Sequence, residues 1–479
     1  MKKFVAVCLS ILISAVFVPN AVADEKELMD LIKQLQSQMS QMQNALNEQK
    51  DKIQQLESRP PQVQLTPPAP GSEAPLPAPM TDSEFNERLS TALGGADQWL
   101  KDLKFAGDLR LRYEAFDFST GNPKQTPDRN RFRMRLRYGF EKTFNPDMKI
   151  GFGMITGEQD SGFHKEPGAG NQTFTNLFNY KNIWIEKAYA TYTPHYLNLG
   201  PVQKVEVTAG KFNNPFEKGA SDLIWDRDVK PEGVYEKIDA RLLKTDALEF
   251  NLYATAGQFI LQESSTLGKD AELFAYQGGI TPVIHLPFLK KPVELLSAIS
   301  YYDYDNFSYN SNFFIGGVVN ASNGNLNVDG DPTTLDARNF NIIQSYSEIA
   351  VYPYGLPVRF LFDFARNTRE AAVSPSVTGN DNAYALGVKL GRLQKKHDWE
   401  AGYTYKYLPA NSTVGVFSDS DFAGGFVGHR GSVFKLGYSL TDSLVLNGMA
   451  CFAENLNDGT AGIIDQQQRR FQVDLTWKF

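Results

Sequence analysis

Residues 130–142 read NRFRMRLRYGFEK, in which apolar side chains alternate with polar ones, four of them arginines. A period of two residues predicts a β-strand, because successive side chains of a strand point to opposite faces. A buried guanidinium needs a partner, so the arginine face is expected to meet water rather than a dry core. The opposite register would turn arginines toward lipid at about 2–4 kcal/mol each. We therefore expect a membrane strand with these side chains pointing inward: Arg131, Arg133, Arg135 and Arg137.

The preceding segment, KFAGDLRLRYEAFD at residues 104–117, places Arg110 and Arg112 on the same inward face. Alternation continues along the chain and predicts sixteen strands, near residues 104–117, 130–142, 147–157, 183–194, 201–213, 233–244, 247–259, 270–281, 292–304, 342–353, 357–368, 382–391, 397–407, 431–441, 444–454 and 469–479. Short turns alternate with long segments at 158–182, 214–232, 305–341 and 408–430, as periplasmic turns alternate with external loops in outer-membrane barrels. The predicted fold of residues 103–479 is all-β, a transmembrane antiparallel barrel of about sixteen strands.

The chain ends on FQVDLTWKF, another alternating stretch. Its apolar face consists of Phe471, Val473, Leu475, Trp477 and Phe479. In a soluble protein such a terminal strand would need cover, whereas in a closed barrel it pairs with the first strand and faces lipid. The stretch also resembles the C-terminal signal of bacterial outer-membrane proteins. The resemblance implies that the barrel assembly machinery is a partner during biogenesis.

Residues 1–23, MKKFVAVCLSILISAVFVPNAVA, have the organisation of a secretory signal peptide: a basic tip, an apolar core and a small-x-small end. The alternative is a retained membrane anchor, but the apolar core is about 15 residues, short of the ~20 that a spanning helix needs. Cys8 lies in this leader, so Cys451 alone remains and the exported chain is expected to have no internal disulfide.

Residues 24–58 carry a heptad of apolar residues from Leu28 to Leu56, which predicts a short α-helical coiled coil. A lone amphipathic helix is the alternative. Residues 59–81 form a proline-rich linker, with eight prolines between Arg59 and Met80, that favours extended polyproline. Residues 82–102 are predicted to contain a short helix ending near Gly94. An even number of strands places the coiled coil on the periplasmic side.

The sequence gives no sign of catalysis. None of the five histidines stands beside a Ser or Cys in a recognisable nucleophile motif, and no phosphate loop or Cys/His spacing predicts a cofactor or metal. Acidic clusters at residues 303–310 and 418–422 would be either calcium ligands in external loops or plain solvated loops. The net charge of −7 argues against nucleic acid as a partner.

The stretch AGKFNNPFEKGASDLIWDRDVKPEGV, residues 209–234, resembles a known family. The bacterial outer-membrane "putative porin" family carries GK, then NPF, then a W-D-x-D-x-x-P-E-G run; these are Gly210–Lys211, Asn214–Phe216 and Trp225–Gly233 here. GKFNNPF also resembles the corresponding stretch of phosphate-selective porins. The resemblance covers residues 103–479. It implies a trimeric diffusion channel and leaves the solute open.

The same segment carries the charged residues Glu217, Asp222, Asp226, Asp228 and Glu232. In porins of this general type an external loop folds into the lumen and narrows the channel, so the resemblance implies that these acids lie opposite the arginines. Opposed charges would set a field across the pore. The alternative is an ordinary charged surface loop.

Two functions fit these observations. The first is a porin of the bacterial outer membrane, in contact with outer-membrane lipid, for passive diffusion of small hydrophilic solutes or ions. The second is a structural anchor that tethers the membrane through the periplasmic coiled coil. A barrel near sixteen strands leaves an aqueous channel, and an anchor needs neither that channel nor an arginine row facing water. The sequence therefore favours the porin.

Overall fold

The computed structural model describes residues 102–120, 128–158, 170–175, 177–263, 270–306, 325, 340–369, 381–456 and 466–479. The chain divides into two units, Met1–Phe85 and Asn86–Phe479, and every described residue lies in the second. The predicted leader, coiled coil and proline-rich linker therefore lie outside the described residues, as does residue segment 82–101. Within the described ranges, no helix is long and apolar enough to cross a membrane.

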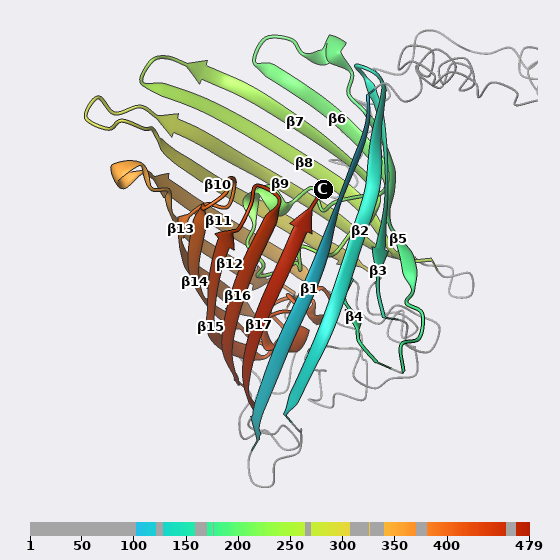
Figure 1. Ribbon diagram of the computed structural model, residues 1–479. Helices are drawn as coiled ribbons and strands as arrows, with labels where there is room; N and C mark the ends of the chain where they lie inside the picture. Colours follow the sequence, from blue (N-terminus) through green and yellow to red (C-terminus); the bar gives the residue numbers. More distant parts are fainter. Residues whose placement is uncertain are drawn as a thin grey trace, which may run out of the picture. The chain divides into compact units, whose positions relative to one another are not determined.

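The described residues form one antiparallel sheet, closed into a barrel (Figure 1). Its strands are β1 Leu103–Thr120, β2 Arg129–Asn145, β3 Met148–Thr156, β4 Gln172–Thr173, β5 Ile183–Tyr192, β6 Val202–Lys211, β7 Glu232–Lys244, β8 Leu248–Gln262, β9 Ala271–Ile284, β10 Val293–Asp305, β11 Asn341–Val351, β12 Val358–Asn367, β13 Asn382–Gly391, β14 Trp399–Leu408, β15 His429–Ser439, β16 Leu444–Asn455 and β17 Gln466–Lys478. Among these described strands sixteen are long and β4 has two residues. The predicted sixteen-stranded barrel is confirmed.

The barrel closes where the last strand meets the first. β17 pairs antiparallel with β1, with Leu111 opposite Leu475 and Arg112 opposite Asp474. The closure extends to the final residue. The Phe479 N–H donates to the Gly107 carbonyl at 3.1 Å, and the Gly107 N–H donates to the Phe479 carbonyl at 2.9 Å. Since β17 also pairs with β16, this terminal strand has no free edge.

The two faces of the barrel wall differ as the alternation predicts. On β2 the side chains of Phe132 and Tyr138 are 60% and 42% exposed on the outer surface. Arg133 and Arg135, which alternate with such residues, are both 8% exposed. The outer surface therefore carries the apolar face of the strand, and the arginine face is covered from within.

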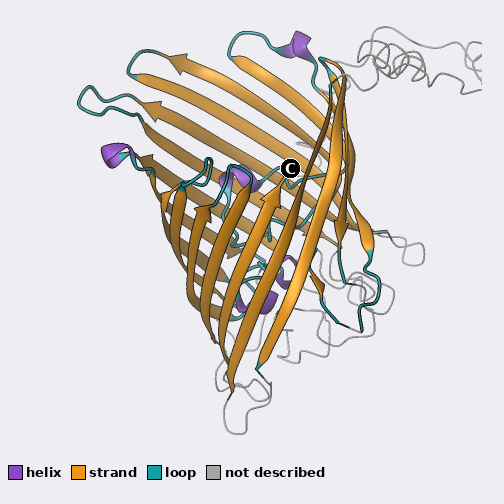
Figure 2. Cartoon of the chain, viewed as in Figure 1, coloured by secondary structure: helices purple, strands orange, loops and turns teal. Residues whose placement is uncertain are grey.

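Two segments between strands fold into the barrel interior (Figure 2). We name residues 212–231, between β6 and β7, the first inner segment, and residues 409–428, between β14 and β15, the second inner segment. The first contains the 3₁₀ helix η2 Glu217–Gly219, and the second contains η6 Gly415–Phe417 and η7 Ala423–Gly425. Phe216 and Leu223 of the first and Phe422 of the second share a hydrophobic cluster with Leu273 and Tyr302 of the inner wall.

The position of the second inner segment differs from the prediction, which made residues 408–430 an external loop. Val414, Phe417, Phe422 and Val427 are all at most 6% exposed. Their spacing follows neither a helical nor a strand period, so the sequence pattern indicated only a loop. Their apolar side chains nevertheless need cover, and they find it against the inner wall.

Candidate functional site

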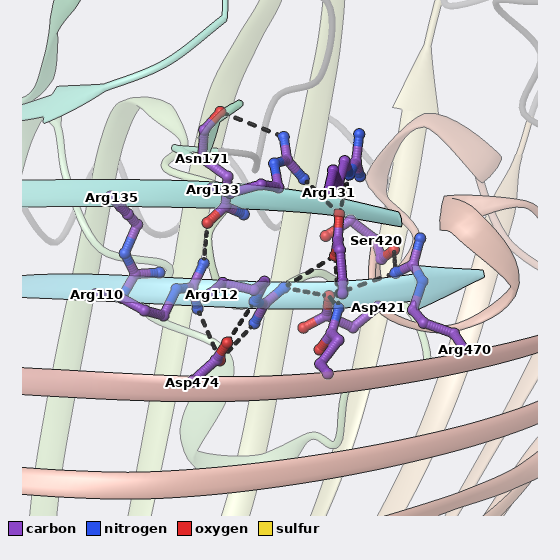
Figure 3. A network of polar contacts seen from close by, with 12 residues as sticks. Arg110, Arg112, Arg131, Arg133, Arg135, Asn171, Ser420, Asp421, Arg470 and Asp474 are labelled. Carbon is purple, nitrogen blue, oxygen red and sulfur yellow. Dashed lines mark hydrogen bonds and ion pairs between the residues drawn. The ribbon is translucent and has the colours of Figure 1, made fainter. Parts of the chain in front are cut away.

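The arginines predicted on β1 and β2 lie side by side on the inner wall. Antiparallel pairing sets Arg110 opposite Arg135 and Arg112 opposite Arg133. Figure 3 shows these side chains together with Arg470 of β17, which the prediction missed. We call this set the arginine row: Arg110, Arg112, Arg131, Arg133, Arg135, Arg137 and Arg470. Arg470 alternates with Phe471, so extending the terminal pattern backward by one residue would have found it.

Carboxylates match the arginine row in number. Ion pairs within 4.0 Å join the seven arginines to seven acids among the described residues: Asp108, Glu114, Glu158, Glu186, Asp228, Asp421 and Asp474. Four of these acids come from the strands of the wall. The row is thus electrically balanced, and of these seven acids the sequence analysis had named only Asp228 opposite the arginines.

The centre of the network is buried. Arg112 is 5% exposed and binds Asp474 with both ends of its guanidinium fork, at 2.7 Å and 2.8 Å. Glu114 is 1% exposed and pairs with Arg131 and Arg133. Bidentate contacts between arginine and carboxylate fix geometry as well as charge. These side chains are therefore held in one position by their ion pairs.

The first inner segment leaves the wall at two glycines of the resemblance motif. Gly210 of β6 and Gly233 of β7 lie opposite each other in register and have φ of 120° and 147°. A Cβ atom on Gly210 would lie 2.3 Å from the Ala188 carbonyl oxygen, and one on Gly233 would lie 2.1 Å from that of Gln258. Only glycine fits both positions, since it lacks a Cβ and adopts positive φ readily.

Of the five acids predicted in this segment, one reaches the arginine row. Asp228 contacts Arg137 at 2.8 Å and Arg135 at 3.4 Å. Burial opposes the ionisation of Asp228, but these two arginines outweigh it and lower its pKa. Glu232 instead begins β7 and pairs with Lys211 at 2.5 Å, and Glu217 lies in η2 with no ion pair to the row in the described structure.

Asp222, a further predicted acid, binds cations that do not belong to the arginine row. Its carboxylate lies 2.5 Å from Arg227 and 3.8 Å from Lys435 of β15. Burial opposes its ionisation, yet Arg227, Lys435 and Lys406 lower the pKa of Asp222 to about 2. The side chains of Arg227 and Lys435 remain 70% and 55% exposed. The exposed charges around Asp222 are therefore the two cations Arg227 and Lys435, whereas the sequence analysis had singled out the acids.

Asp226 lies where the two inner segments meet. Its carboxylate accepts the Asp228 N–H at 2.8 Å and the Ser420 N–H at 2.9 Å. Burial, and then the nearby charges of Asp228 and Asp419, raise the pKa of Asp226 to about 7. Asp226 therefore bridges the segments through backbone hydrogen bonds and contacts none of the arginines of the row in the described ion pairs.

The second inner segment supplies two acids that sequence reasoning assigned to a possible calcium site. Asp421 pairs with Arg112 at 2.9 Å and Arg470 at 3.4 Å, and Asp419 pairs with Lys406 at 2.6 Å. Burial opposes ionisation, but the two arginines hold the pKa of Asp421 well below its ordinary value. Within the described part of the chain no group of three or more His, Cys, Asp or Glu side chains could hold a metal ion. The partners of these acids are barrel cations.

The predicted assembly residues form a row on the outer face of β17. Phe471, Val473, Trp477 and Phe479 are 46–59% exposed, and Leu475 lies opposite Leu111 on the same face. Phe471 also packs edge-on against Phe452 of β16, with ring centroids 5.8 Å apart. The row is accessible along its length and belongs to the apolar surface of the barrel.

A closed antiparallel barrel with an apolar outer face and a charged interior has the architecture of a membrane β-barrel. The family described as "Putative porin" matches residues 123–333 and 354–479, and the chain belongs to this family. Family membership and the barrel together support an outer-membrane porin.

The chain is similar over most of its length to several solved structures. OprB of Pseudomonas putida at high pH is 12% identical, covering 82% of this chain and 97% of that chain, with a TM-score of 0.46. A loop L8 deletion mutant of OmpT of Vibrio cholerae is 12% identical over 79% of this chain and 99% of that chain, with a TM-score of 0.40. OmpF of Salmonella typhi in complex with daunomycin is 11% identical over 79% of this chain and 97% of that chain, with a TM-score of 0.41. No curated protein matches the sequence.

Proposed function

We propose that the protein is a porin through which small hydrophilic solutes or ions diffuse passively across the outer membrane, without catalysing a reaction. The observation that carries the proposal is the charged inner wall of a closed barrel. Seven arginines and seven acids line one side of the interior. Charged groups on an inward face suit a water-filled passage, because a charged side chain is stable only beside water or an ionic partner.

The channel narrows at the first inner segment. Support comes from two contacts of that segment with different strands of the wall. Asp228 binds Arg137 of β2 at 2.8 Å. Ser221 donates its N–H and its hydroxyl to Asp363 of β12, at 2.8 Å and 2.6 Å. A segment that is attached to two such separated strands crosses the interior and leaves less room for solute.

The arginine row lies beside this constriction and acts on the passage through its electric field, since Arg112, Arg133 and Arg135 are themselves only 5–8% exposed. The balance of seven arginines and seven acids favours a channel with weak or no preference for ion charge, since opposite charges close together cancel at a distance. The exposed Arg227 and Lys435 add a local preference for anions. The expected selectivity is therefore near neutral, with a slight lean toward anions.

We further propose a homotrimer, on the resemblance and on the heptad of residues 24–58, which would give three barrels a common periplasmic stalk. Phe471, Val473, Leu475, Trp477 and Phe479 serve as the assembly signal. The alternative function, a tether that acts through the coiled coil with the barrel as an anchor, does not require the inner segments or the charged wall. Both roles are compatible in one molecule.

Current recording from the purified protein in a planar bilayer separates these functions. A porin gives stepwise increases in current as single channels insert. A barrel that serves only as an anchor gives none, and an absence of steps from folded, inserted protein would contradict the proposal.

A further inference from the structure

The second inner segment is built into the barrel interior. Ser412 and Thr413 are 0% exposed, and Val414 and Phe422 are 1% exposed. Such burial is typical of a core element rather than of a surface loop, because a buried segment must have its apolar groups packed and its polar groups paired. The segment therefore has one defined position among the strands of the wall.

This segment contacts the first inner segment along its middle. The Asp226 N–H donates to the Phe417 carbonyl at 2.7 Å, and the Ser420 N–H donates back to the Asp226 carboxylate at 2.9 Å. The rings of Trp225 and Phe417 stack with centroids 4.9 Å apart. Such aromatic pairs contribute about 0.5–1.5 kcal/mol beyond the burial of their area. The two segments are thus joined by both polar and aromatic contacts.

Two cations of the barrel wall bind the pair of segments. Lys406 of β14 donates to the Asp222 carbonyl of the first segment at 3.1 Å and to the Asp419 carboxylate of the second at 2.6 Å. Arg112 of β1 binds Asp421 of the second segment at 2.9 Å (Figure 3). Each segment therefore has its own carboxylate on the arginine row, Asp228 in the first and Asp421 in the second.

We propose that the second inner segment is a second constriction element, which holds the first in place and sets the width of the passage together with it, with Asp421 as its attachment to the arginine row. The proposal rests on the proposed channel function. The first segment is attached to the barrel wall at Ser221 and at Asp228, on either side of Trp225 and Asp226. Its Trp225–Asp226 stretch packs on the second segment, so loosening the second segment removes the support of the first.

The test is the Asp421→Asn variant of the full chain in planar bilayers. The amide cannot pair as an ion with Arg112 and Arg470, so the second segment loosens and one negative charge leaves the arginine row. We expect a higher single-channel conductance, more current noise in the open state, and a reversal potential shifted toward anions. Asp442→Asn is the matched control, because this acid lies in the turn between β15 and β16, where its carboxylate accepts the Lys396 N–H.

Chymotrypsin provides a readout that does not depend on conduction. Phe422 is 1% exposed, so the folded wild-type protein should resist cleavage after this residue, and Asp421→Asn should be cleaved there. Mass spectrometry of the fragments identifies the site, and a gel-mobility shift on heating verifies that the barrel is folded. Phe417→Ala removes the stack on Trp225. Like Asp421→Asn, it should raise the single-channel conductance, but it leaves the charge of the segment unchanged.

The possible failures are distinguishable. If the wild type gives steps but Asp421→Asn matches Asp442→Asn in conductance, reversal potential and protection, the second segment is not a constriction element and the inference is overturned. If the wild type gives no steps at all, the channel function itself is contradicted.

Discussion

Charge balance is the main feature of the site at the scale of single residues. Arg112 and Glu114 are nearly inaccessible, yet each is ionised beside several partners. Removing one partner of a buried ion pair leaves an uncompensated charge and costs about 3–5 kcal/mol. The arginines therefore position the inner segments. In the proposed channel they would also contribute to the electric field of the passage.

Replacing Arg133 and Arg135 by Gln should shift the selectivity of the channel toward cations. The double substitution leaves Glu114, Asp108 and Asp228 with fewer positive partners. Reversal potentials under a salt gradient measure the shift, which should grow at low ionic strength because the Debye length rises from about 10 Å at 0.1 M to about 30 Å at 0.01 M.

Arg430→Gln is the control for this prediction. Arg430 pairs with Glu454 at the end of β15, away from the arginine row, and its side chain is 49% exposed. If the double substitution moved the reversal potential no more than the control while the barrel stayed folded, the arginine row would not face the permeation path.

The arginines were predictable from the alternation of the sequence, whereas among their acidic partners only Asp228 was named, and that on the family resemblance. The period of two residues places the arginines of β1 and β2 on one face of one hairpin, so local pattern suffices. Asp421 lies 309 residues from Arg112 along the chain, and Asp228 lies 91 residues from Arg137. Such contacts depend on how distant segments fold into the barrel, which periodicity does not describe.

At the scale of elements, the strands were predictable from the sequence and the interior position of the second inner segment was not. Each of the sixteen predicted strands is present, with ends that differ by at most three residues, because lipid on one side and water on the other impose a strict alternation. β4 is too short to have a pattern. The inner segments are in contact with the barrel wall and with each other on several sides, so their apolar residues follow no single period. For this reason the sequence analysis did not predict that residues 409–428 lie in the interior.

The terminal strand provides a prediction about assembly. Phe479→Lys should reduce the amount of folded protein in the outer membrane of cells while leaving refolding in detergent nearly unchanged. One exposed aromatic side chain contributes little of the lipid-facing area, and its backbone bonds to Gly107 do not need the ring. The residue is, however, the end of the proposed assembly signal.

Tyr138→Lys is a control at the same level of the barrel. Tyr138 pairs with Gly107 on β1, as Phe479 does from the other side, and it is also exposed on the outer surface. If both variants lost folded protein equally in cells, the effect would be a general cost of a charge facing lipid, and the assembly role of Phe479 would be refuted.

At the scale of the whole molecule, the barrel should be independent of the N-terminal region. All the described strands lie within residues 103–478, and a proline-rich linker transmits little order between the parts that it joins. Deleting residues 24–80 while keeping the leader should therefore leave a barrel that folds and inserts. Outer-membrane fractionation and the heat-dependent gel shift measure this, and failure of the shortened chain to reach the membrane in a folded form would show that the domain boundary is wrong.

The central claim is that the barrel encloses a passage for ions, and single-channel recording tests it most directly. Purified full-length protein is added to a planar bilayer in a simple salt solution, and the same protein after heat denaturation serves as the control. The account predicts discrete steps of uniform size from the native protein, with a reversal potential near zero or slightly toward anions under a salt gradient. Folded protein that inserts into the bilayer and gives no steps would contradict the account.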